Sequence, residues 1–212
     1  MTRPLPISVL ACVLLLVGCR AQPRPDAHVR VAPAGLLPPN VLGYDFQWQQ
    51  RVTARWPTGR QGFDAVLQKR GAELMMVGLS PLGLPGFVLS LRESGEIEVV
   101  NRTGRKLPFE PRYVIADIQR TFFPWLPPPP AAGYSGELSG QVGDQHVVDV
   151  YGRGLLVARR FERPTAQGLE RVEITYHGHR PAHDAPKRAV LKNKLLGYVL
   201  TIDTVQQARL PP

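Results

Sequence analysis

Four side chains in the C-terminal third are of types that bind metal ions: His177, His179, His183 and Asp184. Imidazole nitrogens and carboxylate oxygens are zinc ligands, and residues two apart on a strand point to the same face. His177 and His179 therefore have a spacing that could hold a metal ion. The segment is, however, a polar strand end between prolines, which is typical of a solvated loop. We expect neither a metal site nor another cofactor.

A single carboxylate, Asp117, lies within an otherwise apolar stretch. A buried carboxylate can act as a general acid or base. The alternatives are that Asp117 faces solvent or pairs with Arg120, three residues further on, along one helix face. The chain has no Gly-x-Ser-x-Gly, phosphate-loop or dinucleotide-binding motif. We therefore expect a protein that is not an enzyme.

The remaining candidate for chemistry is Cys19, whose thiol can carry a lipid. Arg3 precedes an apolar run of about eleven residues (7–17), which is too short to cross a bilayer as a helix and suits an export signal. The run ends in Leu-Val-Gly-Cys, which is similar to the lipobox of bacterial lipoproteins. We predict a signal peptide over residues 1–18 and attachment to membrane lipid through acylated Cys19. The alternative is an ordinary secretory signal that is cut elsewhere.

Composition limits the possible partners. Cys12 leaves with the signal peptide, so the mature chain cannot form an intramolecular disulfide. The formal net charge of +9 falls to +8 without Arg3. Nucleic acid is not an expected partner of an exported lipoprotein. Two explanations of the positive charge remain: binding to anionic lipid, or an arginine-rich surface that has no partner. Arg20 follows the cysteine where inner-membrane lipoproteins carry Asp, which points to the outer membrane with the domain facing the periplasm.

The spacing of apolar residues predicts the elements. Residues 19–42 are rich in proline, which indicates a tether, and residues 43–207 are expected to form one domain. A helix is expected from residues 110–111 to Pro124, with Ile115 and Ile118 on its apolar face. Period-two alternation predicts strands at 46–56, 63–69, 73–79, 86–92, 96–101, 155–162, 169–177, 189–193 and 197–205. The fold class is mostly β (α+β), a single curved antiparallel sheet whose concave face the helix can cover.

A loop of unusual composition joins two of these strands. Pro81, Gly83, Pro85 and Gly86 set a turn, yet Leu82 and Leu84 lie at its tip. Exposed leucines are unfavourable in water and gain about 1.5 to 3 kcal/mol each when buried in lipid. The two leucines either contact a membrane or fold back onto the core.

Here the chain resembles LolB, the outer-membrane lipoprotein that receives lipoproteins from the carrier LolA. The resemblance rests on Pro81-Leu82-Gly83 and on strands at 171–176 and 198–202. The chain also resembles a family of uncharacterised outer-membrane lipoproteins associated with aryl-polyene gene clusters. Segments 113–119, 125–126, 159–160 and 197–202 carry that likeness, which covers about residues 44–205.

The resemblance implies a LolA/LolB-like half-barrel of about nine to eleven strands, whose concave face lies under a helical lid and holds acyl chains. Only Leu82 and Leu84 match the membrane-inserting loop of LolB. The chain departs from LolB in its proline run at 127–130 and in its shorter helical segment.

We therefore expect a carrier of acyl lipids or lipoproteins at the outer membrane. The alternative is a membrane-tethered docking module with a filled core and no ligand. The residues expected to line a cavity, each of which could equally pack a core, are Trp48, Val52, Trp56, Phe63, Leu67, Phe87, Leu89, Ile115 and Ile118.

Overall fold

The computed structural model describes residues 35–107, 109–178 and 185–211, and the structural statements below refer to these. A short 3₁₀ turn, η1 (Pro39–Val41), precedes eleven strands and one α-helix, α1 (Pro111–Phe122). The strands before the helix are β1 (Phe46–Trp56), β2 (Gly59–Arg70), β3 (Glu73–Leu79), β4 (Pro85–Leu91) and β5 (Ile97–Asn101). Those after it are β6 (Gly136–Val142), β7 (Gln145–Gly152), β8 (Leu155–Thr165), β9 (Gly168–His177), β10 (Arg188–Asn193) and β11 (Tyr198–Arg209).

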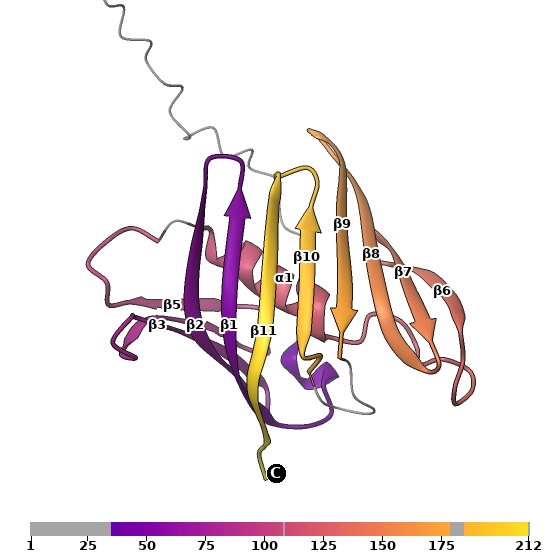
Figure 1. Ribbon diagram of the computed structural model, residues 1–212, viewed down its shortest axis with the longest axis horizontal. Coiled ribbons are helices and arrows are strands. Elements are labelled where there is room, and N and C mark those ends of the chain that lie inside the picture. Colours follow the sequence, from indigo (N-terminus) through magenta and orange to yellow (C-terminus); the bar gives the residue numbers. More distant parts are fainter. Residues whose placement is uncertain (1–34, 108, 179–184, 212) are drawn as a thin grey trace, which may run out of the picture.

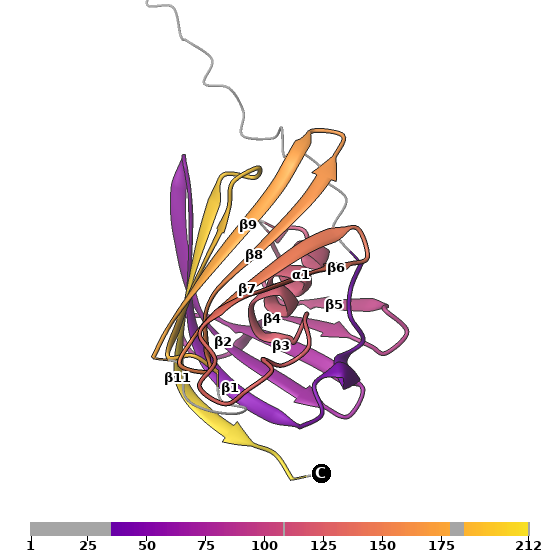
Figure 2. The same cartoon turned by 90° about the vertical axis from the view of Figure 1, so that its right-hand side faces the viewer.

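All eleven strands form one antiparallel sheet in the order β5-β4-β3-β2-β1-β11-β10-β9-β8-β7-β6. The first and last strands pair at its centre, with Val52 opposite Ile202. Two meanders therefore run outward from this central pair, and β5 and β6 are the two edges. The sheet curves around α1 without closing (Figures 1 and 2).

Alternation along the strands decides which side chains enter the concave face. On β1, Phe46, Trp48 and Val52 are buried, whereas Arg51 and Arg55 are exposed. Successive side chains of a strand point to opposite faces, so the apolar set faces the helix and the charged set faces solvent.

The helix crosses the concave face because it connects the two opposite edges of the sheet. Pro111 occupies the first turn, where its missing N–H has no intrahelical partner to lose. Ile115 and Ile118 are buried. Figure 2 shows α1 enclosed between the meander that contains β3 and β4 and the one that contains β7 to β9.

Most predicted elements are present, with two differences. The helix and nine strands lie where alternation and helical spacing place them, within a few residues at their ends. Strands β6 and β7 were not predicted, so the strand count is higher than the nine segments expected. The lid is also modest, because among the described residues it consists of one α-helix of twelve residues. Within the same residues, no helix is both long and apolar enough to cross a membrane.

Candidate functional site

The concave face is filled. Leu67, Leu89 and Ile115 have no accessible surface. A side chain beside a water-sized space keeps some accessible area, so zero exposure means protein atoms on every side. Of the other residues predicted to line a cavity, Trp48, Val52, Phe87 and Ile118 are buried, and Trp56 and Phe63 are half-buried. The structure thus brings most of these residues into one core with α1; whether that core opens to a ligand stays a prediction.

One half of this core is aromatic and aliphatic. Phe46 and Trp48 stack with ring centroids 3.8 Å apart, and Trp48 meets Phe122 of α1 edge-on at 5.3 Å. On β4, the Phe87 ring also meets Phe63 of β2 edge-on, with ring centroids 5.8 Å apart. The helix therefore meets β1 to β5 mainly through apolar contacts.

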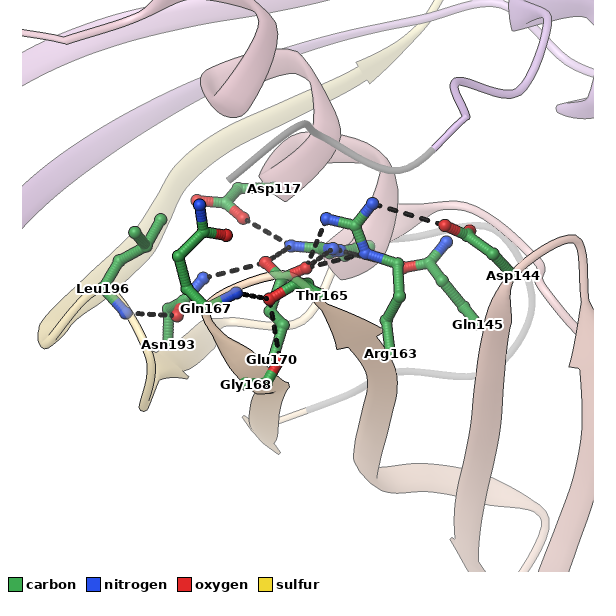
Figure 3. Close-up of polar contacts among 11 residues, drawn as sticks. Asp117, Asp144, Gln145, Arg163, Thr165, Gln167, Gly168, Glu170, Asn193 and Leu196 are labelled. Carbon is green, nitrogen blue, oxygen red and sulfur yellow. Dashed lines mark hydrogen bonds and ion pairs between the residues drawn. The ribbon is translucent and has the colours of Figure 1, made fainter. Parts of the chain in front are cut away.

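The other half contains a buried ion-pair network, drawn in Figure 3. The Glu170 carboxylate accepts two hydrogen bonds from the Arg120 guanidinium at 3.2 Å each and two from Arg163 at 2.8 and 3.0 Å. Gln145 and Asn193 complete the cluster, each within 3.3 Å of one of these charges. Burial alone would raise the pKa of Glu170, but the two guanidiniums hold it below its ordinary value.

A third buried arginine, Arg159, lies at the end of the helix. Arg159 forms a bidentate ion pair with Asp149 at 2.6 and 2.8 Å. Its remaining nitrogen donates to the carbonyl oxygens of Arg120 and Phe123, at 3.1 and 2.7 Å. The last carbonyls of a helix have no intrahelical partner, and a cation is favourable at that end. Arg159 therefore fixes the C-terminus of α1 to β7 and β8.

Asp117 lies in the same region, between α1 and β11. Its carboxylate accepts a hydrogen bond of 2.5 Å from the Tyr198 hydroxyl and lies 3.6 Å from the Arg120 guanidinium. Burial raises the pKa of Asp117 to about 6, although Arg120 and Tyr198 favour the charged form. Asp117 therefore does not face solvent: it is buried and lies beside Arg120, three residues further along the helix.

Two aromatic side chains add polar anchors to the last turn of α1. The Trp125 indole donates to the Gln119 carbonyl at 2.8 Å, and the Tyr176 hydroxyl donates to the Thr121 carbonyl at 2.9 Å. The Gln119 amide also pairs with both backbone groups of Leu37 at 2.6 and 2.8 Å. The C-terminal half of α1 is thus held by hydrogen bonds and ion pairs from several elements.

The loop between β3 and β4 projects its leucines outward. Leu82 is 86% exposed and Leu84 is 63% exposed. The turn is closed by backbone bonds of 2.8 Å from Ser80 to Leu84 and from Gly83 to Ser80. Gly83 adopts φ +76, which favours glycine. Neither leucine folds back onto the core; contact with a membrane stays a prediction.

Exposed cations lie beside this tip. The segment after β5 carries Arg102, Arg105 and Lys106, all exposed. The segment starts beside the first residues of β4, which follow the tip, since the backbone N–H of Arg102 donates to the Gly86 carbonyl at 2.8 Å. An apolar tip thus stands next to a basic loop.

Several residues named from the sequence cannot be placed. Cys19, His179, His183 and Asp184 lie outside the described residues. His177 ends β9, where it is exposed and opposite Arg188 of β10. The lipid anchor and the absence of a metal site therefore stay predictions.

The ion-pair network was missed although the sequence carries a signal for it. On β9, Glu170 is in phase with the inward residues Val172 and Ile174. On β8, Arg159 and Arg163 are in phase with Phe161 in the same way. A charge at an inward position of an alternating strand indicates a buried pair.

Comparison with known proteins places the chain in a family. No curated protein matches it. The fold is similar to that of a LolA superfamily protein from Nitrosomonas europaea (12% identity, TM-score 0.43, 82% of this chain and 90% of that one). It is also similar to a domain from Vibrio parahaemolyticus that is provisionally described as an outer membrane lipoprotein-sorting protein domain (9% identity, TM-score 0.47, 78% of this chain and 85% of that one). A third similar structure is a DUF1329 family protein from Desulfovibrio piger (8% identity, TM-score 0.37, 80% of this chain and 88% of that one).

The sequence family described as protein of unknown function DUF3261 matches residues 47–206, which include the helix and all strands except the first residue of β1 and the last three of β11. This chain therefore belongs to the DUF3261 family.

Proposed function

We propose that this protein is a membrane-tethered, non-enzymatic carrier of acyl lipids or lipoproteins that works at the outer membrane from the periplasmic side. The observation that carries the proposal is the pair of leucines at the β3–β4 tip, Leu82 and Leu84, exposed beside a basic loop. Two such leucines would gain free energy on entering a bilayer, and the neighbouring cations would meet anionic head groups.

The attachment of α1 supports a lid. Hydrogen bonds and ion pairs of defined geometry hold its C-terminal half against β7 to β10, so the helix can stay attached there while it moves away from β1 to β5. Exposing to water the apolar surface that the helix leaves costs about 25 cal/mol per Å², unless another apolar group covers that surface. An acyl chain would take that role. In this proposal the structure shows the helix in its closed position.

The tip is tested by liposome flotation of residues 35–212, prepared without the lipid anchor. The double variant Leu82→Glu, Leu84→Glu should lose binding to anionic liposomes, while its free energy of unfolding changes by about 0.5 kcal/mol or less per site, because exposed side chains contribute little to stability. The matched control is Leu169→Glu with Val205→Glu, two other exposed apolar residues (50% and 66%). Flotation of the tip variant at the wild-type level would contradict the proposal.

The filled concave face favours a second candidate, a docking module without a ligand, because Leu67, Leu89 and Ile115 are fully covered by protein. A fluorescent fatty acid separates the two candidates. Saturable binding that native lipid displaces supports the carrier. The docking module is supported if the folded domain binds liposomes through Leu82 and Leu84 but binds no acyl probe.

A further inference from the structure

The convex face of the sheet carries a row of cations that like-charge repulsion disfavours. In the strand register, Arg60 of β2 lies directly opposite Arg55 of β1, Arg55 lies opposite Val199 of β11, and Val199 lies opposite Lys192 of β10. Like charges directly opposite each other destabilise an antiparallel pair. Among the described residues, none of the three cations has an ion-pair partner.

A parallel row on the same face shows the usual arrangement. This row crosses β1 four residues before Arg55, and its members alternate in charge across β2, β1, β11 and β10: Asp64, Arg51, Asp203 and Arg188. Arg51 pairs with Asp64 at 3.0 Å, and Arg188 pairs with Asp203 at 2.5 Å. Two rows on one surface thus differ: this row is neutralised and the row of Arg55 is not.

The carboxylate nearest to the cationic row does not neutralise it. Glu173 of β9 lies opposite Lys192 in the register, but its carboxylate pairs with Lys194 at 2.5 Å. Lys192 therefore keeps its positive charge without a described partner.

The cationic row borders a hollow. A depression of about 260 Å³ is lined by Thr53, Arg55, Lys192, Val199 and Thr201. Thr53 and Thr201 lie opposite each other on the two central strands, two residues along the same face from Arg55 and Val199. Figure 1 looks onto this face, with α1 behind the strands. The hollow is smaller than the roughly 300 to 1,000 Å³ of sites that enclose a whole organic ligand, so its size suits one anionic group.

We propose that this hollow binds a phosphate group. Arg55 and Lys192 supply charge from two sides, and the hydroxyls of Thr53 and Thr201 supply donors at its floor. Arginine and lysine are the common phosphate-binding side chains, and hydroxyls add neutral donors. A bound phosphate removes the repulsion between the cations that the bare fold leaves in place. The site lies on the face opposite the buried core and does not depend on the carrier function.

The test uses the full chain in neutral detergent, titrated with inorganic phosphate in one arm and with short-chain phosphatidic acid in the other. Binding is followed by calorimetry and by amide chemical shifts of β1, β10 and β11. We expect saturable binding with shifts centred on Thr53, Val199 and Thr201. Tighter binding of phosphatidic acid identifies a lipid head group as the source, and equal binding identifies a free phosphate.

Matched variants separate the site from overall charge. Arg55→Gln with Lys192→Gln should weaken binding about tenfold, which corresponds to about 1.4 kcal/mol for the loss of two exposed charge contacts. Arg112→Gln with Arg153→Gln removes the same charge from two exposed residues outside the hollow and should leave binding unchanged. Equal weakening by both pairs, or absence of saturable binding in both arms, would overturn the proposal.

Discussion

The two halves of the sheet hold the same helix by different chemistry. On the side of β1 to β5, α1 packs through rings and aliphatic groups such as Trp48 and Phe122. On the side of β7 to β10, it is held by buried charges, above all Glu170 and Arg159. Apolar contacts lose free energy whenever they are opened to water, whereas polar contacts exchange protein partners for water partners.

This difference bears on how the domain could work. The polar half fixes the position and orientation of α1, because ion pairs and hydrogen bonds have defined geometry. The apolar half is the surface that an acyl chain could cover in place of the helix. We therefore expect α1 to stay attached to β7 to β10 and to move away from β1 to β5.

The largest loss of stability is expected for Glu170→Gln, in the polar half. Glu170 neutralises both Arg120 and Arg163, and its side chain is 1% exposed. Removing one partner of a buried pair leaves uncompensated charge, so we expect the free energy of unfolding in urea to fall by about 3 to 5 kcal/mol. The control Glu98→Gln, in an exposed pair with Arg92, should cost about 1 kcal/mol or less. Similar losses in both variants would show that the network contributes no more than a surface pair.

On the apolar half, Leu89→Ala should lower the free energy of unfolding by about 2 to 5 kcal/mol, because Leu89 is fully buried and the truncation leaves a cavity. Leu84→Ala at the exposed tip is the matched control and should change stability by about 0.5 kcal/mol or less. Urea unfolding measures both. A small loss at Leu89 would mean that this half is not packed around α1.

Asp117→Asn probes the polar half through pH. Burial raises the pKa of Asp117 to about 6 from an ordinary 3.8, so the folded state keeps a proton that the unfolded state releases. The resulting stabilisation is present below pH 3.8 and is lost as the pH rises through 6. Relative to Asp117→Asn, the wild type should therefore lose on the order of 2 to 3 kcal/mol between acid and neutral pH. Unfolding curves across that range measure it. A difference independent of pH would contradict the raised pKa.

The smallest effect is expected for Tyr198→Phe. This change removes the hydrogen bond to Asp117 and keeps the ring, so stability should fall by about 1 kcal/mol. Tyr134→Phe, which removes an exposed hydrogen bond to Glu137, should have less effect in the same urea titration. If the two variants are equal, the contact with Asp117 adds nothing beyond a surface bond.

Local patterns predicted much of this fold. The helix was found because Pro111 and Pro124 bracket a stretch of helical spacing, and β1 because its inward residues alternate with polar ones. The edge strand β6 was missed because Gly136, Gly140 and Ser139 give it almost no apolar alternation. Edge strands need fewer apolar residues, since less of their surface is buried.

The polar network was beyond such patterns. Arg120 and Glu170 are fifty residues apart, and they meet only because α1 crosses the face of β9. The in-phase charge of Glu170 indicated a buried partner but not which one. Likewise, the composition of the β3–β4 loop left the direction of Leu82 and Leu84 open, because Pro and Gly set a turn without fixing which way its side chains point.

The most direct test of the carrier proposal is the distance between α1 and β5. Spin labels replace Arg112 on the helix and Glu98 on the strand, both exposed, and the distance distribution is measured with and without oleate. A second pair, Arg51 and Glu98, serves as a control within the sheet. We predict that oleate adds a longer-distance population for the helix pair only. Bound oleate with an unchanged helix distance, or no binding of oleate, would contradict the lid.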